Sequence, residues 1–179
     1  MAEPNILLTG KPRAGKTTLV ERVVERLRRE APGLRLAGFT TTEMRDASGE
    51  RCGFAIVTLA SERATLARVG LESKVRVGRY GVDLEAFERL ALPELARRDA
   101  DLLVVDEIGK MECASGRFRR AVEDALDAPV AVLATLGISG VPFFQALRER
   151  PDVEVITVTP RNRDALVEEL SVRLRGLKG

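Results

Sequence analysis

The chain has 179 residues, 45% of them apolar and 31% charged, which suits one globular domain over residues 1–179 and excludes global disorder. It contains no histidine and only two cysteines, which excludes Ser-His-Asp and Cys-His catalysis and any zinc site with imidazole ligands. The 29 basic and 27 acidic residues nearly balance, which does not indicate a nucleic-acid partner. We find no signal peptide and no apolar run near the ~20 residues of a bilayer span. We therefore expect a cytoplasmic protein without a membrane partner.

Strand-like and helix-like segments alternate through the first half of the chain. We predict strands over Asn5–Thr9 and Leu34–Thr41, with an amphipathic helix over Thr17–Arg29 between them. A turn signal at Asp46–Glu50 makes Gly53–Leu59 the expected hairpin partner of the second strand.

The second half continues the alternation. Helices are predicted over Leu84–Arg97, Phe118–Leu126, Phe143–Arg150 and Ala165–Leu174, and strands over Leu102–Val105, Val130–Thr135 and Val153–Val158. Pro93 should kink or break the first of these helices. The pattern predicts an α/β fold, a three-layer sandwich with a mostly parallel central sheet. The loops after Thr9, Val105 and Thr135 should then meet at one sheet edge.

Residues 10–17 read Gly-Lys-Pro-Arg-Ala-Gly-Lys-Thr and match the P-loop pattern G-x-x-x-x-G-K-[ST]. Two glycines allow the backbone to turn its N–H groups toward an anion, and a helix begins directly after them. The ammonium group of Lys16 can meet the β- and γ-phosphates, and the Thr17 hydroxyl can bind Mg²⁺. The predicted nucleotide-binding residues are Gly10, Lys11, Pro12, Arg13, Ala14, Gly15, Lys16 and Thr17. The side chains of Lys11 and Arg13 either point to solvent or add charge beside the phosphates.

Two carboxylates follow the aliphatic strand Leu102–Val105. Asp106 is placed to support Mg²⁺, and Glu107 to accept a proton from an attacking water. The alternative is a pair of acidic residues that merely end a strand. With Gly109 they also form D-x-x-G, a GTPase switch pattern, but the guanine-specifying N-K-x-D is absent. A signalling GTPase is therefore disfavoured.

Residues 106–112 read D-E-I-G-K-M-E and resemble the signature of a family of small P-loop nucleoside-triphosphatases, which includes the human cancer-related nucleoside-triphosphatase and thermophile homologues. Residues 38–45 resemble its G-F-x-T-x-E-x-R stretch, 77–83 its V-G-x-Y-x-V segment and 159–164 its T-x-x-N-R-[DN] segment. The similarity covers nearly the whole chain. It implies a P-loop NTPase fold and Mg²⁺-dependent hydrolysis of nucleoside triphosphates, with broad base tolerance.

The resemblance also implies roles for single residues. Thr18 would join Gly15, Lys16 and Thr17 around the phosphates and the metal, with Lys16 and Glu107 as the catalytic pair. Glu43 and Arg45 would lie in a segment that closes over the γ-phosphate, or else form a charged hairpin surface. Asn162 and Arg163 would border the base, or else cap the last helix.

Two departures from the family pattern affect the expected rate. Lys11 and Arg13 add positive charge where relatives commonly have an acidic residue and glycines. Relatives usually have a basic residue near the loop after Thr135, whereas this chain has none there before Arg148. Lys110, Arg79 or Arg45 could replace a missing transition-state cation. Without one, a P-loop hydrolase can be slower by about 10³-fold or more, so we expect slow turnover.

Two other functions share the P-loop. A nucleoside or nucleotide kinase would need an acceptor pocket and an arginine-rich lid, and the arginine-containing residues 62–79 could be misread as such a lid. A nucleotide-gated switch associated with nucleic acid would use hydrolysis as a timer, although the balanced charge argues against it. The sequence leaves the preferred base and the oligomeric state open.

Overall fold

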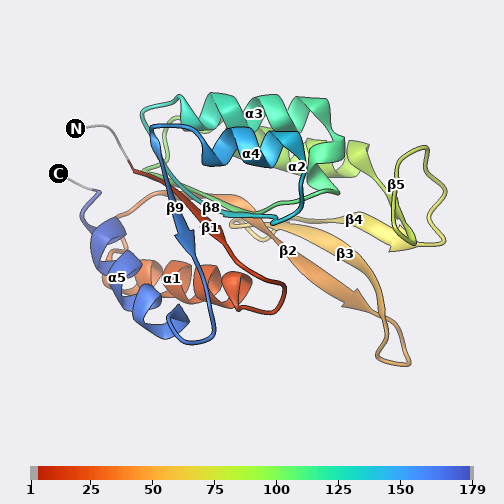
Figure 1. Ribbon diagram of the computed structural model, residues 1–179, viewed down its shortest axis with the longest axis horizontal. Helices are drawn as coiled ribbons and strands as arrows, with labels where there is room; N and C mark the ends of the chain where they lie inside the picture. Colours follow the sequence, from red (N-terminus) through yellow and green to blue (C-terminus); the bar gives the residue numbers. More distant parts are fainter. Residues whose placement is uncertain (1–3, 178–179) are drawn as a thin grey trace.

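The computed structural model describes residues 4–177, and these fold around one nine-stranded sheet (Figure 1). Its strand order is β5-β6-β4-β3-β2-β7-β8-β1-β9. The strands are β1 (Asn5–Thr9), β2 (Leu36–Arg45), β3 (Arg51–Thr58), β4 (Arg63–Val69), β5 (Arg76–Val77), β6 (Tyr80–Val82), β7 (Leu102–Ile108), β8 (Ala131–Leu136) and β9 (Val153–Thr157). Strands β2, β7, β8, β1 and β9 run parallel. Beyond β2, strands β3, β4, β6 and β5 extend the sheet with antiparallel pairing.

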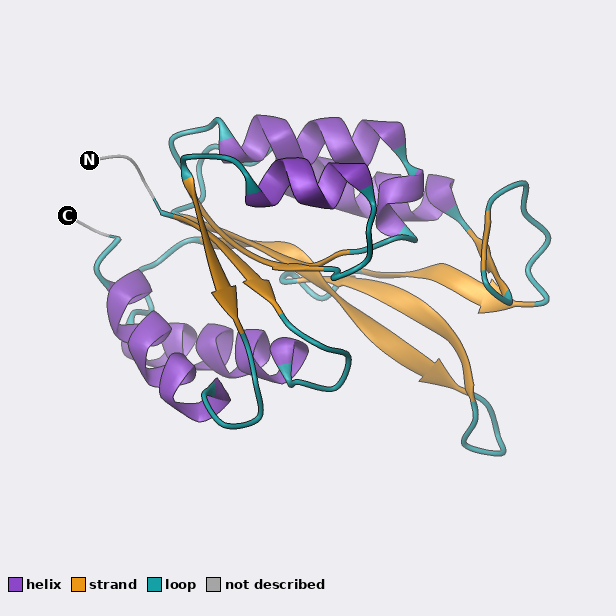
Figure 2. Ribbon diagram, viewed as in Figure 1, coloured by secondary structure: helices purple, strands orange, loops and turns teal. Residues whose placement is uncertain are grey.

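Helices cover both faces of the parallel part of the sheet (Figures 1 and 2). On one face lie α1 (Lys16–Glu30) and α5 (Arg163–Arg175). On the other lie α2 (Leu84–Leu95), α3 (Gly116–Leu126) and α4 (Pro142–Arg148). A short 3-10 helix, η1 (Glu112–Ala114), joins β7 to α3. The predicted three-layer sandwich is therefore confirmed.

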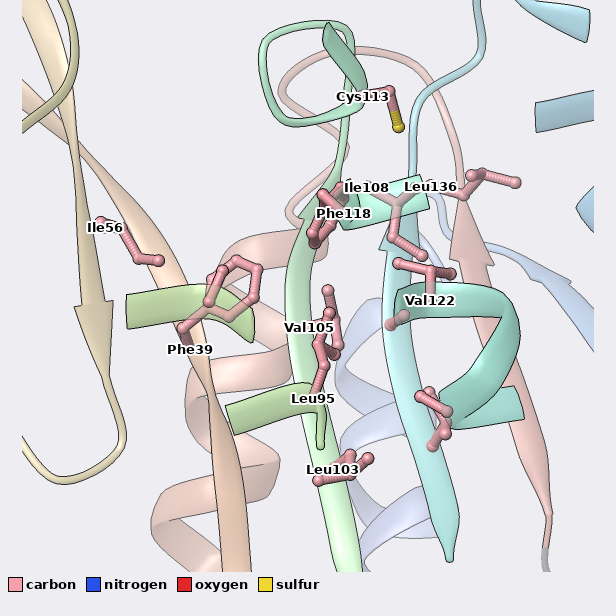
Figure 3. Close-up of a cluster of buried hydrophobic side chains, with 14 of the residues drawn as sticks. Phe39, Ile56, Leu95, Leu103, Val105, Ile108, Cys113, Phe118, Val122 and Leu136 are labelled. Carbon is pink, nitrogen blue, oxygen red and sulfur yellow. The ribbon is translucent and has the colours of Figure 1, made fainter. Parts of the chain in front are cut away.

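Two apolar cores form because side chains alternate between the faces of each strand. In β7, Leu103 and Val105 join the core under α2, α3 and α4, whereas Leu102 and Val104 join the core under α1 and α5. Figure 3 shows the first core, where Phe39 and Phe118 approach from the sheet and from α3. A strand with both faces covered reads as a continuous aliphatic run, as the sequence of β7 does.

The structure corrects two expectations. Strand β7 does not end at Val105 but continues through Asp106 and Glu107 to Ile108, after a shift in its register against β8. Pro93 does not break its helix, because it lies in the last turn of α2, which ends at Leu95. Residues 62–79, which could be misread as a kinase lid, contribute β4 and β5 to the sheet.

No helix within residues 4–177 is long and apolar enough to cross a membrane.

Three buried phenylalanines join β2, α2 and α3. The ring of Phe118 lies 5.1 Å from that of Phe87 and 6.1 Å from that of Phe39, centroid to centroid. We expect Phe118→Ala to lower the free energy of unfolding by about 3–5 kcal/mol, because it opens a cavity in this core. Urea unfolding measures the loss. The control is Phe143→Ala on α4, where the side chain is only half-buried and the loss should be clearly smaller. Equal losses would contradict this account of the core.

Candidate functional site

The P-loop connects β1 to α1 and is shaped by two glycines. Gly15 directly precedes α1 and has φ 95°, a left-handed conformation that glycine adopts without strain. A Cβ at Gly10 would lie 2.5 Å from the carbonyl oxygen of Val158, so the chain after β9 leaves no room for a side chain there. The loop therefore opens at the N-terminus of α1, where free N–H groups and the helix dipole favour an anion.

Lys16 is held within this loop. Its Nζ donates a hydrogen bond to the carbonyl oxygen of Gly10 at 2.9 Å. That bond places the ammonium group beside the backbone that would surround the phosphates. The position agrees with the charge role predicted for Lys16.

Asp106 is almost fully buried at the end of the parallel sheet, with 1% exposure. Its Oδ1 accepts hydrogen bonds from Thr135 Oγ1 at 2.6 Å and from Thr17 Oγ1 at 3.3 Å. Burial raises the pKa of this carboxyl to about 6, while the two hydroxyl groups lower it. Its Oδ2 is buried without a hydrogen-bond partner.

The oxygens of Asp106 and Thr17 fit a magnesium ion. Mg²⁺ prefers oxygen ligands, and in nucleotide sites one or two protein groups hold it together with phosphates. The unpartnered Oδ2 of Asp106 supplies the kind of atom that such an ion or its water shell would satisfy. No cluster of three or more His, Cys, Asp or Glu side chains suited to a metal occurs within residues 4–177, so an ion here would also need the substrate phosphates.

Glu107 is half-buried next to Asp106. Burial raises the pKa of its carboxyl, and the positive charge of Lys16 opposes that rise. A carboxylate with a raised pKa is a stronger base than an exposed one, which suits proton transfer from water. Its position beside the P-loop is therefore chemically suited to the role predicted for it.

A cavity of about 530 Å³ opens in front of the P-loop, and we call it the P-loop cavity. It is lined by Gly10, Pro12, Arg13, Gly15, Lys16, Thr17, Thr18, Glu43, Glu107, Gly137, Ile138 and Arg163. These residues come from the ends of β1, β7 and β8, from β2 and from the start of α5. The predicted meeting of three loops at one sheet edge is confirmed.

Most predicted phosphate-side residues thus lie together, and Glu43 and Arg163 join them. The methylene carbon Cδ of Arg163 lies 2.6 Å from where a Cβ of Gly15 would stand. Lys11 is exposed and does not line the P-loop cavity. Ala14 is buried behind the loop.

Asp106 is buried and does not line the P-loop cavity, and four other predicted residues also lie outside it. Arg45 binds Glu43 and the carbonyl oxygen of Gly49. Arg79 binds Tyr80 and the carbonyl oxygen of Arg51. Lys110 lines a neighbouring cavity.

Asn162, the fourth, stabilises the turn after β9. Its Oδ1 accepts a hydrogen bond from the Thr159 N–H at 2.8 Å, and its Nδ2 donates one to the Thr157 carbonyl oxygen at 2.9 Å. No side-chain hydrogen bond from Asn162 caps α5. Both ends of its amide are therefore already engaged within the protein.

Sequence reasoning missed two residues of this site. Thr135 is fully buried and binds Asp106, and its place as a hydroxyl near the end of an aliphatic strand was the available signal. Glu112 is buried beside Glu107: its Oε2 and the Oε1 of Glu107 lie 2.7 and 2.8 Å from the position of a Cβ on Gly109. Glu112 is the last residue of the D-E-I-G-K-M-E motif, but sequence reasoning gave it no chemical role.

The fold and the loop define a P-loop nucleotide-binding protein, and comparison with known proteins identifies the family. The model of the NTPase family matches residues 5–171. The nucleoside-triphosphatase THEP1 of Thermotoga sp. strain RQ2 is 40% identical over 176 residues, 97% of each chain. The human cancer-related nucleoside-triphosphatase is 41% identical, covering 93% of this chain and 94% of its own. The crystal structure of THEP1 from Aquifex aeolicus superposes with a TM-score of 0.84 at 39% identity, over 95% of this chain and 98% of that one.

The chain belongs to this NTPase family, and the resemblance predicted from its motifs is confirmed.

Glu112 links stability to pH. Burial, and then the charge of Glu107, raise the pKa of its carboxyl to about 8. The folded chain therefore keeps a proton that the unfolded chain loses at lower pH, so stability falls as pH rises from about 4.5 toward 8. We expect the unfolding free energy of Glu112→Gln to fall less over this pH range, because glutamine does not titrate. The part of the fall that Glu112 causes in the wild type is about 1.4 kcal/mol for each unit by which folding raises its pKa.

Urea unfolding between pH 5 and pH 8 measures both slopes. Glu123→Gln, at an exposed position on α3, is the control and should keep the wild-type slope. Identical slopes for wild type and Glu112→Gln would contradict the assignment.

Proposed function

We propose that this protein hydrolyses nucleoside triphosphates to nucleoside diphosphate and phosphate, with Mg²⁺ and with broad base tolerance. One observation carries the proposal: a half-buried carboxylate, Glu107, lines the same cavity as the P-loop lysine. A module that only binds nucleotide needs the loop and the lysine, whereas hydrolysis also needs a base for water. The names of the THEP1 and human relatives support the same activity.

Phosphate binding follows from the loop itself. The N–H groups at the start of α1 would receive the phosphate oxygens, and Lys16 would exchange its bond to the Gly10 carbonyl oxygen for the β- and γ-phosphates. The N–H groups are in place before the substrate arrives, and the Lys16 ammonium has to exchange only one hydrogen-bond partner. They would therefore neutralise charge in the transition state with little rearrangement.

Thr17 and Asp106 would hold the magnesium ion. When bound, the ion would neutralise charge on the β- and γ-phosphate oxygens. The Thr135 hydroxyl would hold the Asp106 carboxylate in place beside the Thr17 hydroxyl. The burial of this carboxylate limits competition from solvent.

Glu107 would hold the attacking water and accept its proton. Burial raises its pKa and makes it a better base, while the nearby ammonium of Lys16 favours its ionised form. The proton would then leave with solvent or product phosphate.

Broad base tolerance is supported by what borders the outer part of the P-loop cavity. Pro12 offers an apolar surface, and the Nε of Arg163 already donates to Asp164 Oδ1 at 3.3 Å. The amide of Asn162 is engaged by the turn after β9. Recognition would thus rest on the triphosphate.

The cations available near the γ-phosphate are few. Among the described residues, the cationic side chains that line the P-loop cavity are Arg13, Lys16 and Arg163. Arg45 and Arg79 are engaged on the hairpin side. This arrangement supports the expected slow turnover of the isolated chain. The two free cysteines, Cys52 and Cys113, fit the reducing cytoplasm, where we propose the protein works.

Removing the base should separate hydrolysis from binding. We expect Glu107→Gln to lower phosphate release from ATP, GTP, CTP and UTP by about 10²-fold or more, because the amide cannot accept the proton. Nucleotide affinity should change little, since the P-loop is intact. Phosphate release and equilibrium binding are measured on the same preparations.

The matched control is Glu25→Gln, at an exposed position on α1. It should hydrolyse like wild type. Full activity of Glu107→Gln would refute the role of this carboxylate, and absence of release from the wild type would refute the proposed hydrolysis.

Metal dependence gives a separate test. We expect a chelator to abolish phosphate release, and Thr17→Ala to raise the Mg²⁺ concentration needed for half-maximal rate by about tenfold or more, because one oxygen ligand is lost. The rate is measured against Mg²⁺ concentration. Thr17→Ser keeps the hydroxyl and should behave like wild type; a shift as large as that of Thr17→Ala would count against the ligand role.

A further inference from the structure

A second cavity of about 300 Å³ adjoins the P-loop cavity, with Glu107, Gly137 and Ile138 lining both. Its volume lies at the lower end of the ~300–1,000 Å³ typical of small-molecule pockets. Ile138, at the shared rim, is 51% exposed although it is a large apolar residue. Hydrolysis as proposed uses none of the other walls of this second cavity.

Two aromatic rings give the second cavity flat apolar walls. The Phe54 ring is held edge-to-face by Tyr80, with centroids 5.3 Å apart. Phe144 is fully buried and presses against Gly137. Val77 completes the apolar lining from the hairpin side. Rigid aromatic and aliphatic walls suit a planar ring that can pack against them.

A polar atom in the lining lacks a partner. The hydroxyl oxygen of Ser139 is buried without a hydrogen bond, and Ser139 lines the second cavity. Leaving a buried polar group unsatisfied costs about 1–3 kcal/mol, which a polar atom of a ligand would recover. The buried carboxyl of Glu112 lines the same cavity and offers a second contact. A ring with polar atoms matches these two groups better than a pure hydrocarbon.

Positive charge gathers beside the apolar walls. The guanidinium carbon of Arg51 lies 5.4 Å from the centre of the Phe54 ring. Arg51 and Arg79 both donate to the Tyr80 hydroxyl oxygen, at 3.1 and 3.3 Å. The carboxylate that pairs with Arg51 is Glu43, which also pairs with Arg45. Arg45 and Arg51 thus share one carboxylate, and Arg79 joins them through the Tyr80 hydroxyl. This group of three guanidinium groups carries an excess of positive charge, which favours a further anion.

We propose that the second cavity is a binding site for a ring-bearing organic monophosphate, separate from the triphosphate site. The ring lies between Phe54 and Phe144 with a polar atom toward Ser139. The phosphate meets Lys110, which lines the cavity, and Arg51, whose guanidinium lies over the Phe54 ring at the cavity wall. The P-loop residues line the first cavity and not the second, so both sites can be filled together, with Glu107, Gly137 and Ile138 at their shared rim.

Isothermal titration calorimetry tests the proposal with AMP, CMP, GMP and UMP as probes. Each is titrated into the full chain already saturated with Mg²⁺ and a non-hydrolysable ATP analogue. At least one should bind in a 1:1 ratio, and the matching uncharged nucleoside and inorganic phosphate should each bind at least about tenfold more weakly. No heat with any of the four monophosphates would overturn the proposal, as would binding seen only when the analogue is left out.

Two variants test the location by different means. Val77→Trp fills the cavity, and Arg51→Gln removes the guanidinium over the Phe54 ring. Each should weaken monophosphate binding by about tenfold or more. Val172→Trp, at an exposed position on α5, is the matched control and should bind like wild type. Unchanged affinity in both cavity variants would overturn the proposed location. Because the readout is binding, the result stands apart from whether the chain releases phosphate.

Discussion

The carboxylate of Asp106 holds the centre of the site together. Its Oδ1 accepts hydrogen bonds from the hydroxyl of Thr17 at the start of α1 and from that of Thr135 near the end of β8, while Asp106 itself belongs to β7. Burying a carboxylate is unfavourable, and these two hydrogen bonds offset part of that penalty. The arrangement requires the P-loop helix and two parallel strands to end at one place. The P-loop cavity, the position of Glu107 and the loop at Gly137 all depend on that convergence.

Sequence patterns predict those parts of the molecule whose cause is local. The P-loop is readable because its glycines, Lys16 and Thr17 are consecutive and lie between a buried strand and an amphipathic helix. The aliphatic run of β7 is readable because both of its faces are covered. Strands β4, β5 and β6 were not predicted. Their residues alternate weakly, Arg63 and Val69 are exposed, and β5 has two residues that form a strand only through pairing with β6.

The same distinction applies to side chains. The roles of Asp106 and Glu107 could be inferred from their place after a buried run. The role of Thr135 could not be inferred, because it depends on β8 being the neighbour of β7 in the sheet. The local pattern of apolar residues predicts strands but not their order. The hydrogen bond from Arg79 to the carbonyl oxygen of Arg51 likewise depends on strand order, because β4 lies between β3 and β6 in the sheet.

Strand β2 belongs to two parts of the sheet at once. Its first half pairs with β7 from Leu36 to Thr40, and its second half pairs with β3 as far as Arg45. Beyond Thr40 it therefore has β3 as its only neighbouring strand within residues 4–177. Glu43 and its arginine partners therefore lie on the part of β2 that the parallel core does not pair with, although Glu43 still lines the P-loop cavity. The fold thus joins a phosphate-binding edge made of parallel strands to a charged antiparallel arm, and a single strand connects the two.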